Sequence, residues 1–269
     1  MDTSLNGINC IFLDLDGTIY LGDQLIPGAL EFLERCDERG IRRFFLSNNS
    51  SRSVTQYIEK LRGLGIPAKP DEVMLSTHQL IQVLLGGPSP FNPGAVEEEI
   101  TGVFLVGTEG MRSMIEAAGI QTDSDNPEAV VLGYDTEINY EKIATAAKHL
   151  HAGVPLIASH PDVVCPSPDG GLPDVGAMIS MFEAATGVTP KFVCGKPEPG
   201  MIEHKIRKLG VSLEQCVMVG DRLYTDMEMA ERAGVKGVLV LSGEATLDDL
   251  EGAPQNPDLV VGSVDELLR

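Results

Sequence analysis

Apolar and polar positions follow two patterns that alternate from one end of the chain to the other. Short runs of consecutive apolar residues are typical of strands buried on both faces, and stretches between them repeat their apolar residues every three to four positions, as amphipathic helices do. The predicted strands are 8–13, 43–47, 72–75, 103–106, 129–132, 154–158, 192–194, 216–219, 237–241 and 259–261. The predicted helices are 27–39, 51–62, 76–85, 109–118, 140–151, 177–185, 200–209 and 226–233. Repeated strand–helix alternation predicts an α/β fold with a doubly wound parallel sheet.

A Gly/Pro-rich segment, 86–94, interrupts the alternation, and a second alternating series begins beyond it. This segment cannot form regular structure because its glycines and prolines favour turns. The chain has 269 residues, which allows one large domain or two of ordinary size. The break is compatible with a second domain inserted into the first, and composition leaves both organisations open.

The charge balance narrows the expected partners. The chain carries 40 acidic and 20 basic residues, a formal net charge of −20. Such a surface repels nucleic acid and anionic membranes, so neither is expected as a partner. A phosphorylated substrate would be repelled too, and its site would need a local cation, either Lys/Arg or a metal.

The expected location of the protein and the expected state of its cysteines follow from patterns that the sequence lacks. It shows no apolar run of the roughly 18 residues that a membrane span needs, and no secretory leader pattern. The five cysteines occur singly, without a C-x-x-C pair, and three lie in apolar runs, so we expect small core residues rather than a disulfide framework. These features predict a soluble cytoplasmic protein.

Two carboxylates stand at the end of the first apolar run. Asp14 and Asp16 follow the segment 8–13, and Gly17 then allows the backbone to turn. Alternate residues of an extended chain face the same way, so the pair can converge on one point. Two anions this close repel each other unless a cation or a shared proton lies with them. The pattern suits a Mg²⁺ site in which one carboxylate is a nucleophile and the other an acid/base.

Three further polar clusters directly follow predicted strands. Each alone has a simpler interpretation as a turn, a helix cap or a solvated loop. At the carboxyl edge of one parallel sheet they would combine carboxylates for a metal, hydrogen-bond donors for phosphate oxygens and a cation. The clusters are Ser47-Asn48-Asn49, Gly195-Lys196-Pro197 and Gly220-Asp221-Arg222 with Asp226.

The four motifs D-L-D-G-T, S-N-N, G-K-P and G-D-R-L-Y-T-D resemble those of the haloacid dehalogenase (HAD) superfamily, and most closely the branch of the sugar phosphatase NagD and the p-nitrophenyl phosphatases. Relatives often have T-N-N where Ser47 begins the second motif, and T-N-P-D where residues 159–162 read S-H-P-D. The resemblance implies a Rossmann-like core formed by 1–80 and 187–269, and an inserted α/β cap formed by 81–186.

The resemblance also implies roles at the metal. Asp14 would attack phosphorus and form an aspartyl-phosphate, and Asp16 would act as the general acid and base. Mg²⁺ would be held by a carboxylate oxygen of Asp14, the carbonyl of Asp16 and Asp221. Asp226 would orient Lys196 or a water molecule, and neither Asp226 nor Thr18 would contact the metal directly.

The remaining implied roles concern the substrate, a small phosphorylated metabolite. Lys196 would balance charge between the nucleophile and the phosphate, and Ser47, Asn48 and Asn49 would bind phosphoryl oxygens. A long loop of the cap, 159–174, would set specificity, with His160 and Asp162 as the expected contacts. A homodimer formed through the cap is compatible with this branch. The roles of Arg222 and Tyr224 stay open.

Two other functions use the same residues. A phosphotransferase or phosphomutase would pass the aspartyl-phosphate to a sugar hydroxyl, but within this superfamily it usually has a smaller, helical cap. A catalytically idle phosphate-binding module would typically lack one of Asp14, Asp16, Lys196 or Asp221, and all four are present. The expected activity is therefore Mg²⁺-dependent hydrolysis of a phosphomonoester.

Overall fold

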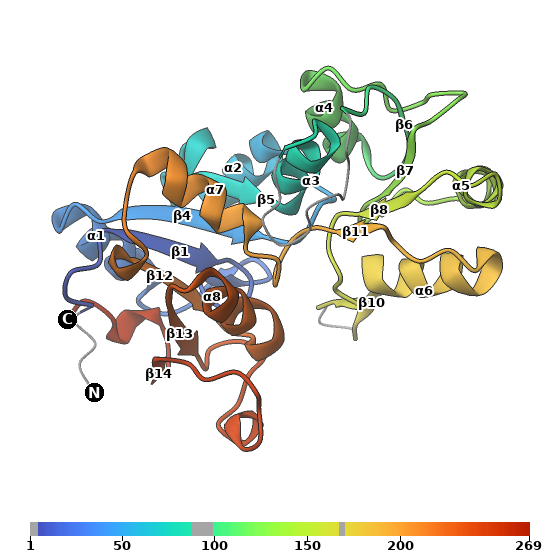
Figure 1. Ribbon diagram of the computed structural model, residues 1–269. Helices are drawn as coiled ribbons and strands as arrows, with labels where there is room; N and C mark the ends of the chain where they lie inside the picture. Colours follow the sequence, from blue (N-terminus) through green and yellow to red (C-terminus); the bar gives the residue numbers. More distant parts are fainter. Residues whose placement is uncertain (1–4, 88–98, 167–169) are drawn as a thin grey trace. The chain divides into compact units, whose positions relative to one another are not determined.

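The computed structural model describes residues 5–87, 99–166 and 170–269 (Figure 1). The chain divides into two compact units. The core unit comprises Met1–Ser47, Tyr57–Met74 and Met201–Arg269, and the inserted unit comprises Asn48–Gln56 and Leu75–Gly200. The predicted core with an inserted α/β cap is confirmed, whereas the predicted boundaries at 80/81 and 186/187 stay a prediction.

The core unit is built on a six-stranded sheet in the order β14-β13-β12-β1-β4-β5. Its strands are β1 (Cys10–Asp14), β4 (Arg42–Ser47), β5 (Val73–Leu75), β12 (Cys216–Gly220), β13 (Lys236–Val240) and β14 (Leu259–Val261). β1 pairs in parallel with both β4 and β12. The chain moves from β1 toward β5 on one side, and later from β12 toward β14 on the other. The strand order therefore reverses between β1 and β12, where ligands bind in open α/β sheets.

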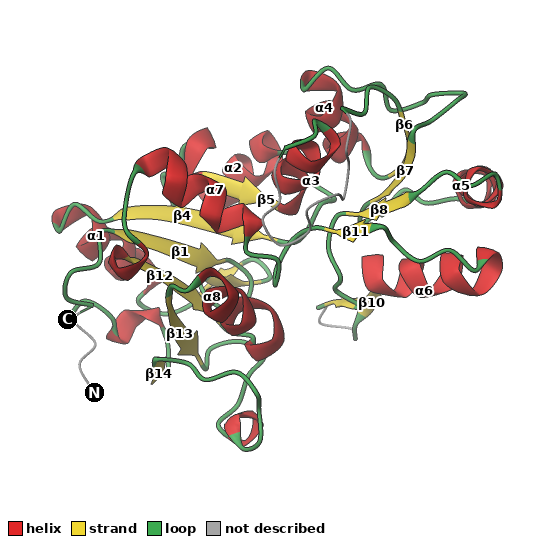
Figure 2. Cartoon of the chain, in the orientation of Figure 1, coloured by secondary structure: helices red, strands yellow, loops and turns green. Residues whose placement is uncertain are grey.

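Helices cover both faces of this sheet (Figure 2). Alternate residues of β1, such as Cys10 and Phe12, pack against Met201 of α7 (Gly200–Leu209) and Met229 of α8 (Glu228–Ala233). On the opposite face the buried Arg43 donates to the carbonyl of Leu33 in α1 (Ala29–Glu38). α2 (Val54–Gly63) precedes β5 along the chain. Burial of both faces explains why the core strands read as continuous apolar runs.

The inserted unit has a four-stranded parallel sheet in the order β11-β8-β7-β6. Its strands are β6 (Val103–Val106), β7 (Ala129–Leu132), β8 (Leu156–Ala158) and β11 (Phe192–Val193). One face packs against α3 (Ser76–Leu84) and α4 (Glu109–Ala117). The other packs against α5 (Tyr140–His151) and α6 (Val175–Thr186). The second alternating series of the sequence is therefore a second doubly covered sheet.

The structure adds short elements that the sequence pattern did not reveal. The predicted long loop 159–174 contains an antiparallel hairpin of β9 (Val164–Cys165) and β10 (Leu172–Pro173). A second hairpin joins β2 (Tyr20–Leu21) to β3 (Gln24–Leu25). Two-residue strands are too short to give a periodic signal, which explains both omissions.

Two further predictions concern segment boundaries. Most of the predicted turn-rich break at 86–94 lies outside the described residues. The predicted helix 226–233 is preceded by a π-helical turn, Leu223–Met227, before α8 begins. Within the described part of the chain, no helix is both long and apolar enough to span a membrane.

Candidate active site

Three carboxylates meet where the strand order of the core sheet reverses. Asp14 is the last residue of β1, and Asp221 directly follows β12, its parallel neighbour. Asp14, Asp221 and Asp226 are all buried, and each offers an oxygen that lies within 4.8 Å of the others. The register brings Asp14 and Asp221 to the same edge because the carboxyl ends of adjacent parallel strands lie side by side. The predicted approach of the first and fourth motifs is therefore present in the structure.

The two oxygens of Asp221 have different surroundings. Oδ2 accepts a hydrogen bond from the backbone N–H of Glu244 at 2.7 Å. Oδ1 is buried and has no hydrogen-bond partner among the described residues. Burial and, after it, the negative charges of Asp14 and Asp226 together raise the pKa of Asp221 to about 8. A carboxylate in this position needs a compensating cation to stay ionised at neutral pH.

Asp226 is brought back to the cluster by the π-helical turn. Its backbone N–H and that of Met227 both donate to the carbonyl of Arg222, the second bond spanning five residues. The Asp226 side chain in return accepts from the backbone N–H of Arg222 at 3.1 Å. A Cβ on Gly220 would lie 2.3 Å from the Asp226 carboxyl carbon, so glycine is required for this close approach. Asp226 thus stabilises the turn that follows Asp221.

The other predicted residues of the core unit occupy three kinds of position. Asp16 is exposed and accepts from the N–H of Gly22 at 3.4 Å, so its carboxylate is open to solvent. Thr18 is fully buried, and its hydroxyl has no hydrogen-bond partner within the described residues. Ser47 ends β4, one strand from Asp14, and its hydroxyl lies 2.8 Å from that of Tyr57.

The donor set of this edge fits a small divalent cation. Mg²⁺ binds oxygen ligands and commonly uses one or two carboxylates with several waters. Asp14 and Asp221 supply carboxylates, and the buried Oδ1 of Asp221 is an acceptor that the described protein leaves unsatisfied. A buried acceptor without a partner is costly unless water or an ion satisfies it. The residues present therefore fit the predicted cofactor.

In the inserted unit, Asn48 and Lys196 are joined by a two-point clamp. The Asn48 side-chain oxygen accepts from the backbone N–H of Lys196 at 2.7 Å, and its amide nitrogen donates to the Lys196 carbonyl at 3.0 Å. The same nitrogen lies 3.2 Å from a carboxylate oxygen of Asp162. Lys196 is only 4% exposed, and the preceding Gly195 donates its N–H to Gln79. The structure thus uses the Asn48 amide to fix the backbone of the predicted catalytic lysine.

His160, one of the two predicted cap contacts, belongs to a buried hydrogen-bonded chain. His160 is fully buried, with Nδ1 2.9 Å from the Ser159 hydroxyl and Nε2 2.9 Å from Asp174. Asp174 also caps α6 by accepting from the N–H of Val175. Both ring nitrogens of His160 are therefore engaged within the protein, whereas Asp162 is partly exposed.

Asn49, the last residue of the predicted phosphate cluster, forms an Asx turn. Its side-chain oxygen accepts from the backbone N–H of Ser51 at 2.9 Å and from the Ser51 hydroxyl at 2.6 Å. This side chain shapes the segment that leads into α2.

Sequence reasoning missed one segment of the site, the four residues 242–245 that follow β13. The Ser242 hydroxyl donates to the carbonyl of Gly17, and the Glu244 N–H donates to Asp221. The Glu244 side chain contacts Arg222 Nε at 2.9 Å and the Tyr224 hydroxyl at 2.7 Å. Polar residues after a predicted strand were the signal used for the other clusters, and the same signal would have found this one.

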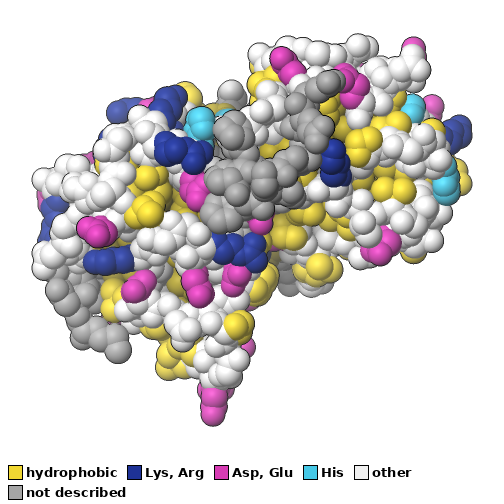
Figure 3. Space-filling view, viewed as in Figure 1, with side chains coloured by type: hydrophobic (Ala, Val, Ile, Leu, Met, Phe, Trp, Pro, Cys, Tyr) yellow, Lys and Arg dark blue, Asp and Glu magenta, His cyan; other side chains and the backbone are white. Residues whose placement is uncertain are grey.

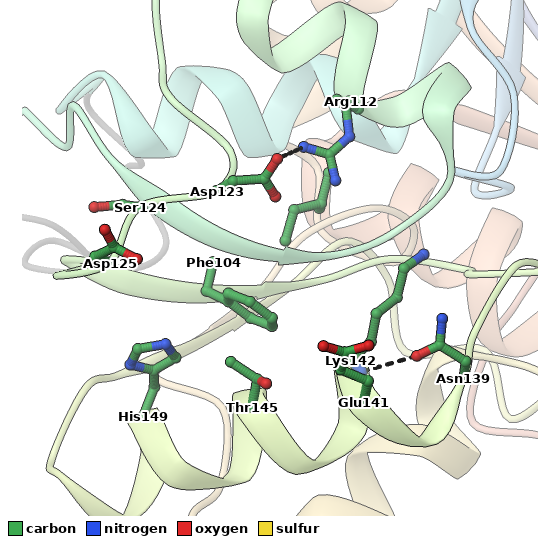
Figure 4. A pocket seen from close by; sticks show the side chains of 11 residues that line it. Phe104, Arg112, Asp123, Ser124, Asp125, Asn139, Glu141, Lys142, Thr145 and His149 are labelled. Carbon is green, nitrogen blue, oxygen red and sulfur yellow. Dashed lines mark hydrogen bonds and ion pairs between the residues drawn. The ribbon is translucent and has the colours of Figure 1, made fainter.

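The inserted unit contains a hollow of about 530 Å³, and no predicted site residue lines it (Figure 4). Phe104 forms its floor beside His149, and Arg112 and Lys142 reach into it from α4 and α5. Arg112 is paired with Asp123 at 2.7 Å, and Lys142 with Asp135 at 2.8 Å. Because both cations are already neutralised, this hollow is not the candidate active site.

On the face in Figure 3, acidic and basic side chains are interspersed.

Comparison with known proteins agrees with these motifs. A model of haloacid dehalogenase-like hydrolases matches residues 11–121, and a HAD-hydrolase-like model matches residues 193–267. An acid sugar phosphatase of Staphylococcus aureus is 33% identical over 257 residues, which cover 95% of each chain.

Solved structures of phosphatases share the whole fold. A 4-nitrophenylphosphatase of Thermotoga maritima has a TM-score of 0.90 and 40% identity, covering 98% of each chain. A glycerol phosphate phosphatase of Mycobacterium tuberculosis, solved in complex with magnesium, has a TM-score of 0.87 and 29% identity, covering 100% of this chain and 79% of that one. With its carboxylates at the switch point, the chain belongs to the haloacid dehalogenase-like hydrolases, in their NagD-like branch, and is a phosphoric monoester hydrolase.

Proposed function

We propose that this phosphatase is Mg²⁺-dependent and hydrolyses a small phosphorylated sugar or polyol through an aspartyl-phosphate on Asp14. One observation carries the proposal. The Asp14, Asp221 and Asp226 carboxylates lie within 4.8 Å of one another at the switch point of the core sheet, and Oδ1 of Asp221 is buried without a hydrogen-bond partner among the described residues. This cluster is the arrangement that a divalent cation would stabilise.

In the first step, a carboxylate oxygen of Asp14 attacks the phosphorus of the monoester. The bond between phosphorus and the leaving oxygen breaks, and Asp16 donates its proton to the departing alkoxide. In the second step, Asp16 takes a proton from a water molecule, and that water attacks the aspartyl-phosphate. The bond between phosphorus and Asp14 breaks, which releases inorganic phosphate, restores the Asp14 carboxylate and leaves Asp16 protonated for the next cycle. The exposure of Asp16 supports this role, because a group that exchanges protons with water and the leaving alcohol must be accessible.

Asp14, the carbonyl of Asp16 and Asp221 would hold the metal, with Asp226 and Thr18 supporting them. The bound ion would withdraw charge from the phosphoryl group and relieve the repulsion between that group and the attacking carboxylate. Ser47 is one strand from Asp14 at the same edge, which suits its proposed role as a hydrogen-bond donor to a phosphoryl oxygen.

In the inserted unit, we propose that Lys196 supplies the positive charge required by a phosphate dianion in a chain of net charge −20. Asn48 would serve this role indirectly, because both ends of its amide hold the Lys196 backbone. Asp162 is the partly exposed member of the predicted cap contacts and is proposed, with the neighbouring His160 and Asn49, to shape the substrate site.

The proposed substrate class comes from the relatives. The S. aureus relative is named an acid sugar phosphatase, and the M. tuberculosis structure is that of a glycerol phosphate phosphatase. Both enzymes are named after substrates that are phosphomonoesters of small polyhydroxylated alcohols. We therefore expect this chain to prefer sugar or polyol phosphates over aromatic phosphates.

The test is a hydrolysis assay with p-nitrophenyl phosphate followed by a panel of phosphorylated metabolites. We expect turnover that EDTA abolishes and added Mg²⁺ restores, no turnover by Asp14→Asn, and the highest kcat/KM on a sugar or polyol phosphate. Substantial activity in Asp14→Asn would refute covalent catalysis, and full activity in EDTA would refute the metal dependence. Phosphate transfer to an added sugar in preference to water would identify a phosphotransferase.

A further inference from the structure

A short loop after β13, residues 242–245, surrounds Asp221. The Ser242 hydroxyl donates to the carbonyl of Gly17 at 2.6 Å, which ties the loop to the turn after β1. The backbone N–H of Glu244 donates to Asp221 Oδ2 at 2.7 Å, and that of Ala245 donates to the Asp221 carbonyl at 3.0 Å. The loop therefore contacts both the backbone and the carboxylate of the same residue.

Two glycines allow this approach. A Cβ on Gly243 would lie 2.0 Å from Asp221 Oδ2 and 2.5 Å from its carboxyl carbon. A Cβ on Gly17 would lie 2.4 Å from the same Oδ2. Gly17 also has a φ of 88°, which favours glycine for its own reason, whereas Gly243 lies outside the left-handed region. At Gly243 the requirement for glycine therefore comes only from the space that the Asp221 side chain occupies.

The loop is itself held in place by residues that follow Asp221. The Glu244 carboxylate pairs with Arg222 Nε at 2.9 Å and accepts from the Tyr224 hydroxyl at 2.7 Å. Arg222 and Tyr224 thus bind the side chain of Glu244 while its N–H binds Asp221. The contacts form a closed circuit between the 242–245 loop and the fourth motif.

We propose that the 242–245 loop is a positioning element that fixes the Asp221 carboxylate before a cation binds, with Gly243 and Glu244 as its determining residues. The N–H of Glu244 occupies Oδ2, so that Oδ1, the buried oxygen without a hydrogen-bond partner among the described residues, is the atom presented to the metal. The inference rests on the proposed role of Asp221 as a metal ligand.

Fixing the Asp221 carboxylate in advance would raise the affinity of the site for a cation. Three buried carboxylates within 4.8 Å repel one another, and a free side chain would rotate away from its neighbours until the ion arrived. A carboxylate already held in its binding orientation loses no further rotamer freedom on binding, which raises affinity. Arg222 and Tyr224, whose roles the sequence left open, would act through Glu244 on this orientation.

The test measures Mg²⁺ affinity of the metal-free protein by titration calorimetry, independently of turnover. Gly243→Ala should bind Mg²⁺ about tenfold or more weakly, in the range seen when groups that orient metal ligands are altered. Its fold, followed by circular dichroism, should be retained. Gly63→Ala is the matched control, because a Cβ there meets nothing within 4 Å and its backbone is not left-handed. Wild-type affinity in a folded Gly243→Ala protein would overturn the proposal.

A second variant tests the proposal even if Gly243→Ala does not fold. Glu244→Ala removes the contacts with Arg222 and Tyr224 but keeps the backbone N–H, so a severalfold loss of affinity is expected, with recovery in Glu244→Gln. Equal affinities in all three proteins would count against the circuit.

A double variant separates this proposal from the proposed function. If Asp221 is a ligand, Asp221→Asn loses Mg²⁺ binding and adding Gly243→Ala changes nothing more. Wild-type affinity in Asp221→Asn would refute the metal site itself, whereas loss there with unchanged affinity in Gly243→Ala would refute only the loop's role.

Discussion

Replacing Asp221 by asparagine should stabilise the metal-free protein at neutral and alkaline pH while removing its response to Mg²⁺. The folded-state pKa of Asp221 is raised from 3.8 to about 8, mainly by burial and then by Asp14 and Asp226. Between these values the folded state binds the proton more tightly than the unfolded state does. The free energy of unfolding must therefore fall as pH rises from about 4 toward 8, by linkage. Asparagine carries no charge and removes this dependence.

The magnitude follows from the geometry. Two unit charges 4.8 Å apart repel by about 3 kcal/mol at an effective dielectric constant of about 20, and Asp221 has two such neighbours. Water entry and relaxation of the site reduce this sum, so we expect asparagine to raise the free energy of unfolding by about 1–3 kcal/mol above pH 8. For a chain of this size, that gain corresponds to a Tm increase of roughly 2–10 °C. Below pH 4 the difference should vanish, because Asp221 is then protonated in both states.

Thermal unfolding in EDTA at pH 4, 6 and 8.5, repeated with Mg²⁺, tests this reasoning. Mg²⁺ should raise the Tm of the wild type but not that of Asp221→Asn, because only a ligand that binds the folded state stabilises it. Asp248→Asn, which removes an exposed carboxylate from the same unit, is the control for net charge and should leave the Tm within about 1 °C. A Tm of Asp221→Asn below that of the wild type in EDTA at pH 8.5 would show that Asp221 is not under electrostatic strain.

Three further predictions address catalysis and the core. Asp16→Asn should lower kcat by roughly 10²–10⁴-fold with little change in KM, measured by steady-state hydrolysis; an unchanged kcat would assign the proton transfers to another group. Asn48→Ala leaves the Lys196 N–H and carbonyl without the partners that Asn48 gives them, so kcat/KM should fall about 10–100-fold. A kcat/KM that stays near wild type in Asn48→Ser, although it falls in Asn48→Ala, would instead indicate a direct contact of residue 48 with phosphate. Phe12→Ala should cost about 3–5 kcal/mol of unfolding free energy in urea titration, since Phe12 is fully buried and stacks on Phe44; a cost below 1 kcal/mol would mean that the core collapses around the cavity.

The apolar pattern determined the main elements because both sheets are covered on both faces. Strands such as β6 (Val103–Val106) and β7 (Ala129–Leu132) agree with the predicted ranges to the residue. The helix α5 (Tyr140–His151) does so as well. Burial on two sides leaves few polar positions inside a strand, so the end of a strand is usually marked in the sequence by the next polar residue. The same rule places Asp14 and Asp221 at strand ends from the sequence alone.

Side-chain partners depended on the tertiary structure. The sequence predicted Asn48 as a phosphate ligand, and only the fold shows its amide on the Lys196 backbone, 148 residues away along the chain. It likewise took the fold to show that both ring nitrogens of His160 bind within the protein. Residue type limits which bonds a side chain can form, but which of them form depends on what the fold brings near.

The chain by itself therefore determined the chemistry at the rim of the core sheet, because polar groups that break an apolar run can only emerge at a strand's end. Only the tertiary structure decides which oxygen of Asp221 accepts a backbone hydrogen bond and which one is left without a partner among the described residues. A loop that ends 24 residues later in the sequence, at Ala245, supplies the N–H for Oδ2, and a glycine leaves it room. No local pattern encodes that contact, since it arises only when β12 and β13 pair and their following segments meet.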